Sequence, residues 1–202
     1  ATGIYRTLRQ GIEDAYVEAE DEFLYGNPGR GVLSDYPEMK REYQALVLTF
    51  ERSGARHFNF ISSYVLSRNE GNYPGLFNSD FGYYFPNVNG SYDLLETTVN
   101  GDGLLPNDRT HVLKFAGSYR WDLGFMLGST FIWASGTPRS AFTGSSWGSP
   151  WYNFLVPRGS DGRTPSIWDL NLRVAYDLPL KSEMLHQTRL IVDVFHIGSE
   201  RR

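Results

Sequence analysis

The sequence predicts an all-β protein of antiparallel strands in up-and-down order. Apolar and polar residues alternate over stretches of about ten residues, which predicts strands with one apolar and one polar face. Short turns alternate with long connections along the chain, so all the long loops would lie at one end of the sheet. Aromatic residues gather near the strand ends. Together these observations predict a transmembrane β-barrel, present here as a partial barrel.

Composition agrees with this fold class. The 202 residues include thirteen Tyr, thirteen Phe and five Trp, and aromatic residues make up 15% of the chain. Tyr and Trp suit positions where one end of the ring is apolar and the other is hydrated, as at a membrane–water interface. A single domain of this length is common among β proteins.

Several function classes are disfavoured. The net charge is −4 and basic residues form no cluster, so we expect no nucleic-acid partner. Without cysteine there is no disulfide, no thiolate metal site and no cysteine nucleophile. No apolar run is long enough for a membrane-spanning helix. The start lacks the features of a signal peptide, so we expect either a protein that is not exported or an interior piece of a longer chain.

The N-terminal part carries the weakest pattern. Ile4 to Leu8 could end a strand, and Ile12 to Glu20 contains enough helix formers to leave its state open, with a slight preference for extended structure. The stretch from Tyr25 to Gly31 is rich in Gly and Pro and is expected to form a loop.

Local pattern is clearest in the middle of the chain. Tyr43 to Arg52 and His57 to Ser67 alternate on either side of a short turn at residues 53–55, which predicts a hairpin. A long connection from Arg68 to Arg109 follows. Thr110 to Trp121 and Phe125 to Ser135 then form a second hairpin around the tight turn at residues 122–124.

A second long connection spans Gly136 to Ser166, after which Ile167 to Leu178 alternates most regularly. A turn at Pro179 to His186 and a last strand from Gln187 complete the series. Trp168 would lie at the outer membrane interface. The polar residues of these strands would face the barrel lumen, because an Arg exposed to lipid at the bilayer midplane costs roughly 2–4 kcal/mol. The predicted lumen-facing residues are Lys114, Arg120, Asp169, Asn171, Arg173, Arg189 and Asp193.

A soluble β-sandwich would show the same alternation, with its apolar face buried against a second sheet. Three features favour the barrel: the length of the strands, the location of all long loops at one end of the sheet, and the many charged residues on the polar faces.

Several motifs carry a family resemblance. They are Tyr43-x-Ala45-Leu46-x-Leu48-Thr49, Ser63-Tyr64-x-x-Ser67-Arg68-x-x-Gly71-Asn72, Leu105-Pro106-Asn107-Asp108-Arg109-Thr110-His111, Ser135-Gly136-Thr137-Pro138, Pro157-Arg158-Gly159-Ser160-x-Gly162-Arg163-Thr164-Pro165, Trp168-Asp169-Leu170-Asn171-Leu172-Arg173 and Asp193-Val194-Phe195. In this order and spacing the chain resembles the C-terminal barrel of TonB-dependent outer-membrane receptors, in particular the Oar-like branch.

The resemblance implies a barrel of twenty-two strands, of which this chain would supply six or seven as a C-terminal fragment over residues 1–202. It also implies an outer-membrane location in a Gram-negative bacterium, an unknown extracellular ligand, and coupling to the TonB complex through a plug that this sequence does not contain. The loop residues Asn107, Asp108, Arg109, Arg158 and Arg163 belong to the matched motifs. We expect that the fragment alone neither closes a barrel nor transports a ligand.

The C-terminal end departs from the family pattern. The family continues Asp-Val-Phe with Asn and a further strand that ends on an aromatic residue, whereas this chain reads His196 to Arg202. A truncated or frame-shifted end is the expected explanation.

No catalytic or metal site is predicted, so we expect a protein that is not an enzyme and holds no cofactor. The four histidines at positions 57, 111, 186 and 196 lack zinc-site spacing, and Gly144 to Gly148 does not match a serine-nucleophile elbow. Asn100, Asp102, Asn107 and Asp108 form an oxygen-rich cluster, for which turn formation is a better explanation than calcium binding. We expect Asp108 and Arg109 to form a structural pair that pins the loop to its strand.

Leu155 to Ser160 has the same letters as a thrombin-cleavage linker. Native sequence is the preferred interpretation, because the family motif continues through Gly162 to Pro165.

Three functions therefore remain open: a ligand-binding, TonB-dependent receptor; a passive or structural outer-membrane barrel such as a porin-like protein or an adhesin; and a soluble carbohydrate-binding β-sandwich.

Overall fold

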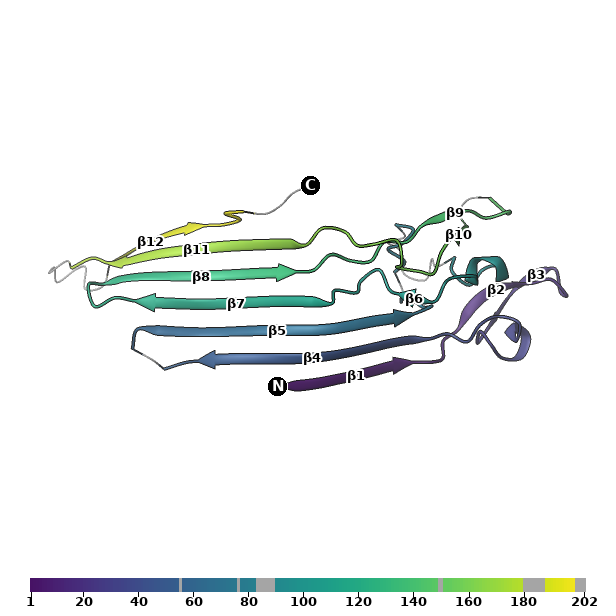
Figure 1. Ribbon diagram of the computed structural model, residues 1–202, viewed down its shortest axis with the longest axis horizontal. Coiled ribbons are helices and arrows are strands. Elements are labelled where there is room, and N and C mark those ends of the chain that lie inside the picture. Colours follow the sequence, from purple (N-terminus) through teal and green to yellow (C-terminus); the bar gives the residue numbers. More distant parts are fainter. Residues whose placement is uncertain (55, 76, 83–89, 149–150, 180–187, 199–202) are drawn as a thin grey trace.

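The computed structural model describes residues 1–54, 56–75, 77–82, 90–148, 151–179 and 188–198. The largest element of the structure is one antiparallel sheet (Figure 1). Its strands are β1 (Thr2–Leu8), β4 (Arg41–Arg52), β5 (Phe58–Gly71), β7 (His111–Arg120), β8 (Phe125–Ala134), β11 (Ile167–Asp177) and β12 (Arg189–Val194), and the short β6 (Gly103–Leu104) adds to β5. The predicted all-β, antiparallel architecture is confirmed.

Spatial order follows sequence order, as β1-β4-β5-β7-β8-β11-β12. The short turns lie at one end of the sheet and all long connections lie at the other (Figure 1). Gly124 closes the turn between β7 and β8 with a φ of 87°, a conformation that favours glycine because other L-residues meet a Cβ clash there. The expected one-ended arrangement of loops is therefore present.

The strands are longer or shorter than predicted by one to four residues. β5 continues to Gly71 because its last residues pair with the start of β4, as in the pair of Arg41 and Gly71. The connection expected from Arg68 thus begins four residues later. The predicted turn at residues 179–186 and the first residue of the last predicted strand, Gln187, lie almost entirely outside the described residues.

The long connections contain regular structure that the sequence pattern did not reveal. β2 (Glu13–Val17) and β3 (Glu22–Gly26) form a hairpin, as do β9 (Phe142–Gly144) and β10 (Tyr152–Phe154). Short 3-10 helices occupy η1 (Gly31–Leu33) and η2 (Leu95–Thr98). The preference for extended structure in residues 12–20 is confirmed by β2. The loop predicted from Tyr25 begins after Gly26, because the first two residues complete β3.

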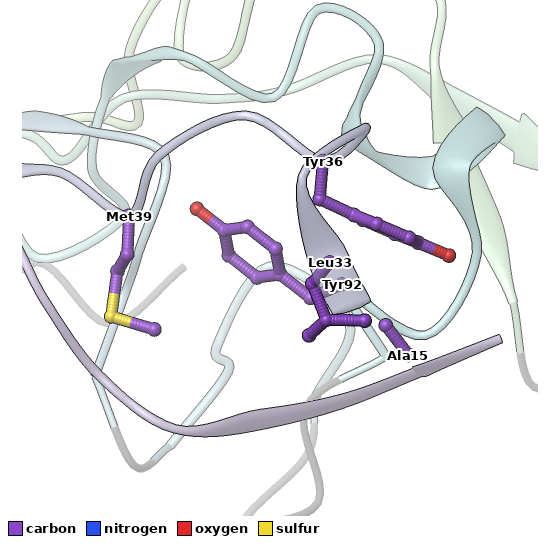
Figure 2. Packing of buried hydrophobic residues seen from close by; sticks show 5 residues of the cluster. All are labelled: Ala15, Leu33, Tyr36, Met39 and Tyr92. Atoms are coloured by element: carbon purple, nitrogen blue, oxygen red, sulfur yellow. The ribbon is translucent and has the colours of Figure 1, made fainter. Parts of the chain in front are cut away.

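We call the described parts of the connections 9–40, 72–110 and 135–166 the loop cap. A hydrophobic core among the described residues lies here and not in the sheet: Ala15, Leu33, Tyr36, Met39 and Tyr92 are buried together (Figure 2). These residues come from two connections, which are joined because the backbone N–H of Tyr16 donates to the carbonyl oxygen of Asp93 at 2.7 Å. The loop cap is therefore a folded unit.

Candidate functional site

The strand register divides the large sheet into an apolar and a polar face. Directly opposed residues of antiparallel strands lie on the same face, so the chain of pairs through Phe115, Phe131 and Leu170 marks the apolar face. The pairs of Lys114 with Ile132 and of Ile132 with Asp169 mark the polar face. The alternation therefore continues in register across neighbouring strands.

Among the described residues, no second sheet packs against the apolar face (Figure 1). Leu190, Val192 and Val194 of β12 remain 58, 53 and 48% exposed, whereas a soluble sandwich would bury such a row. In the described parts of the chain, no helix is long and apolar enough to cross a membrane.

Aromatic side chains border the apolar face at both ends. Near the loop cap, Trp133 and Trp168 oppose each other across β8 and β11. Near the short turns, Tyr119 contacts Trp121 at 4.6 Å between ring centroids. Trp168 and Tyr176 are eight residues apart on β11, about 27 Å along the strand at about 3.4 Å per residue. A tilt of about 40° reduces this to about 21 Å, close to the ~25 Å apolar band of membrane barrels.

All seven predicted lumen-facing residues share the polar face. Arg173 Nε lies 2.6 Å from Asp193 Oδ1 and Arg173 Nη2 lies 2.9 Å from Asp193 Oδ2, which makes a two-point ion pair between β11 and β12. Arg189 pairs with Asp177 on the same two strands at 2.5 Å. Most of the charge on this part of the face is thus already neutralised.

Asp169 and Asn171 hold the segment after β12. The Nδ1 atom of His196 lies 2.7 Å from Asp169 Oδ1, and the backbone N–H of His196 donates to Asn171 Oδ1 at 3.0 Å. Lys114 and Arg120, by contrast, have no ion-pair partner within 4 Å in the part of the chain that the structure describes.

The predicted loop-motif residues hold the loop cap together. Arg163 Nη2 donates to Asp108 Oδ2 at 2.6 Å, and the second carboxylate oxygen accepts the backbone N–H of Asn69 at 2.7 Å. Arg109 instead donates to the carbonyl oxygen of Ser135 at 2.6 Å. The expected pair of Asp108 and Arg109 is therefore corrected: each residue pins the loop, but to different partners.

Among the charged residues that the structure describes, Arg158 has the most deeply buried side chain. Its Nε atom lies 3.0 Å from Asp80 Oδ2, with side-chain exposures of 0 and 4%. The guanidinium stacks over Phe154 at 4.7 Å and donates to the carbonyl oxygen of Asn72 at 3.0 Å. Burial raises the pKa of Asp80, and the attraction of Arg158 opposes that rise. A cleavage linker would be exposed, so the burial of Arg158 supports the interpretation of residues 155–160 as native sequence.

Two further carboxyl groups in the loop cap are perturbed. Burial, with smaller contributions from Asp14 and Asp93, raises the pKa of Glu13 to about 7. Burial also raises the pKa of Asp93 to about 6, although Trp151 Nε1 donates to its Oδ2 atom at 2.8 Å. Glu13 and Asp93 could not be recognised from the local sequence pattern, because their burial depends on contacts between separate loops.

The oxygen-rich cluster is dispersed. Asn100 Nδ2 donates to the carbonyl oxygen of Phe154, Asp102 lies 3.8 Å from Lys40 Nζ, and Asn107 Oδ1 accepts from Asn69 Nδ2 at 2.6 Å. Among the described residues, no group of three or more His, Cys, Asp or Glu side chains is placed to hold a metal ion.

Asn69 and Arg6 were missed as site residues. With Arg41, Tyr43 and Asn107 they line a groove of about 550 Å³ at the loop-cap end of the polar face. A second hollow, of about 540 Å³, lies over the small residues Ala116, Ser118 and Gly128 nearer the short turns. Period-two spacing puts Arg6 on the same face as the apolar Ile4 and Leu8, so the local pattern did not mark Arg6 as a polar-face residue, and nothing in it marked Asn69.

Comparison with known proteins finds one informative relative. The chain is 33% identical over 208 aligned positions to the TonB-dependent transporter Oar of Myxococcus xanthus. The match covers 98% of this chain but 19% of that protein, so the chain spans about a fifth of its relative's length. No protein-family model matches, and no solved structure matches. The chain is thus related to TonB-dependent transporters, as its motifs indicated.

Proposed function

We propose that this chain is part of the outer-membrane barrel of an Oar-like, TonB-dependent receptor that binds an extracellular ligand and passes it inward. In this assignment the apolar face contacts lipid, the polar face lines the lumen, and the loop cap lies outside the cell. The barrel catalyses no reaction; it binds the ligand and lets it pass through a gated path.

The observation that carries the proposal is the uncovered apolar face. A sheet with aromatic borders, no covering layer among its described residues and all its long loops at one end matches the requirements of a membrane barrel. Similarity to the Myxococcus xanthus transporter over nearly the whole chain supports the same assignment.

The two edges of the sheet support a partial barrel. β1 and β12 each pair on one side with a described strand, and an open edge inside lipid would leave backbone groups without hydrogen bonds. We infer that further strands of the full-length receptor flank both edges, and that a plug domain elsewhere in that receptor contacts the TonB complex.

Fractionation of the full-length protein that contains this chain tests the proposal. We expect it in the outer membrane, with a heat-modifiable gel mobility typical of folded barrels, and we expect any ligand uptake to stop when TonB is deleted. Uptake that persists without TonB would instead favour a passive barrel. Recovery in the soluble fraction without detergent would contradict the membrane assignment.

A further inference from the structure

One face of the β2–β3 hairpin carries exposed aromatic side chains. Register places Tyr16 opposite Phe23. It also places Asp14 opposite Tyr25, and directly opposed residues of antiparallel strands share a face. Phe23 is 39% and Tyr25 78% exposed. Ala15 is fully buried in the core of the loop cap, and successive side chains of a strand point to opposite faces, so this face points away from that core.

Trp147, in the connection between β9 and β10, extends the same face. Its ring centroid lies 4.8 Å from that of Tyr16, and the Tyr16 ring lies 5.7 Å from that of Phe23. Trp147 is 50% exposed. It also contacts Trp151 edge-on at 6.1 Å, and Trp151 is anchored because its Nε1 atom donates to Asp93 Oδ2 at 2.8 Å. We call Asp14, Tyr16, Phe23, Tyr25 and Trp147 the aromatic face.

The hairpin that carries the aromatic face is strongly acidic. Residues 13–26 contain six carboxylates and no basic residue. The four carboxylates at residues 18 and 20–22 are exposed. In the described parts of the chain, none of the six belongs to an ion pair. Asp21 is held beside the rings, because its Oδ1 atom accepts a hydrogen bond from the Tyr16 hydroxyl. Exposed rings and negative charge therefore occur together.

The position of the hairpin favours a partner that arrives from outside the cell. Figure 1 shows β2 and β3 at the end of the loop cap farthest from the short turns. Asp14 lies near the open end of the hairpin and Asp21 in its turn, so their positions differ by about 10 Å along the strands, at about 3.4 Å per residue. A small cation would reach one of these carboxylates, whereas an extended chain with repeated cations would reach both.

We propose that the aromatic face binds a basic segment of a polypeptide ligand. Lysine and arginine side chains are attracted to the faces of Trp and Tyr rings, and the carboxylates of the hairpin attract the same groups. An anionic partner is disfavoured, because like charges placed together at an interface repel each other. This inference rests on the proposed function, because that function places the loop cap outside the cell, and it names the class of ligand that the receptor meets there.

The test uses the full-length protein in detergent, isothermal titration calorimetry and two end-capped peptides. One peptide is Lys-Gly-Lys-Gly-Lys-Gly, and the other is the same peptide with every lysine acetylated, which removes the charge. We expect the lysine peptide to bind about tenfold more tightly at low salt, because three exposed contacts of about two- to threefold each multiply to that ratio. The preference should decrease as salt is raised, since exposed charges are screened.

Variants of the face separate its charge from its rings. Asp14→Asn combined with Asp21→Asn should lower the affinity for the lysine peptide about fourfold or more. Tyr25→Leu keeps an apolar side chain but removes the ring, and should lower it about two- to threefold. Glu51→Gln is the matched control for charge, because Glu51 is exposed on β4 beside a short turn. Tyr5→Leu is the matched control for the ring, because Tyr5 is 61% exposed on β1. Neither control should change the affinity, and heat-modifiable gel mobility verifies that each variant is folded.

Equal affinity for the two peptides, or unchanged affinity in the double variant, would overturn the inference. Unchanged affinity in Tyr25→Leu would also overturn it, because general attraction to negative charge would then explain the binding. Full displacement of the peptide by equimolar tetramethylammonium would overturn the polypeptide assignment and indicate a small-cation site. Outer-membrane fractionation of the same samples keeps the two proposals apart: a correctly located receptor without preference for the lysine peptide refutes only the aromatic face, whereas a soluble protein refutes the receptor.

Discussion

Asp108 and Arg163 lie 55 residues apart in the chain, yet their side chains meet at 2.6 Å between Oδ2 and Nη2. Asp108 precedes β7 and Arg163 precedes β11, so this contact joins the ends of two long connections. The Asp108 side chain is 1% exposed and the Arg163 side chain 32%, so the carboxylate is buried and the guanidinium is half-buried.

The first prediction concerns this pair. Asp108→Ala leaves the Asn69 backbone N–H and the Arg163 guanidinium without their acceptor, and we expect it to destabilise the loop cap by about 1–3 kcal/mol, the cost of a buried polar group without a partner. Proteolysis of the loops on intact cells would measure the effect. Arg139→Gln is the matched control, since its pair with Asp161 is exposed and should contribute about 0–1 kcal/mol. Equal proteolysis of both variants would contradict the predicted contribution of the Asp108 carboxylate.

The second prediction concerns Arg158. Arg158→Met keeps much of the length of the side chain but removes the charge opposite Asp80 and the donor to the carbonyl oxygen of Asn72. We expect faster amide hydrogen exchange throughout residues 90–110, while the large sheet stays protected. Arg30→Gln, at an exposed pair with Glu38, should leave the exchange rates unchanged. Slow exchange in Arg158→Met would show that stacking on Phe154 alone suffices.

The third prediction concerns pH. Burial raises the pKa of Glu13 from 4.5 to about 7, so the folded loop cap binds a proton more tightly than the unfolded chain does. Stability therefore falls as pH rises between about 4.5 and 7, where the folded state holds more protons. Asp93 acts in the same direction from 3.8 to about 6.

Hydrogen exchange of β2 at pH 5 and pH 8 would measure this dependence. We expect stronger protection at pH 5, and Glu13→Gln should raise protection at pH 8 and reduce the difference. Asp14→Asn should give a smaller effect, because Asp14 acts on Glu13 only through its charge. Protection that increases with pH would contradict the assignment of a buried, proton-binding Glu13.

The fourth prediction compares the two faces of β8. Phe131→Arg introduces a charge on the apolar face beside Leu170, and near the bilayer midplane this costs roughly 2–4 kcal/mol. Thr130→Arg, one residue away on the polar face beside Asn171, should assemble nearly as well as the wild type. The amount of heat-modifiable protein in outer membranes would distinguish them. Equal assembly of both variants would refute the lipid-facing assignment.

The strands of the large sheet could be predicted because their signal is local. From Tyr43 to Arg52 and from Ile167 to Leu178 the alternation alone determines which side chains share a face, and six strand positions agree with the structure to within a few residues. The location of all long loops at one end of the sheet follows from the order of short and long connections, which can also be read from the sequence.

The loop cap could not be predicted because its contacts are distant in sequence. Arg158 meets Asp80 and Tyr16 meets Asp93 only after three connections have folded together. A charged residue beside several glycines reads as an exposed loop, and nothing local shows that Arg158 is buried. The expected pair of Asp108 and Arg109 failed for the same reason, since their partners, Arg163 and Ser135, belong to another connection.

The separation of the buried cluster around Tyr92 from the uncovered sheet has a consequence for how this molecule responds to its surroundings. The loop cap is organised by exclusion of water, whereas the apolar face of the large sheet stays exposed and, under the proposed function, is covered by lipid. Urea, which weakens hydrophobic burial in water, should therefore unfold the loop cap before the large sheet. Changes in lipid thickness or detergent chain length should affect the large sheet and leave the loop cap intact.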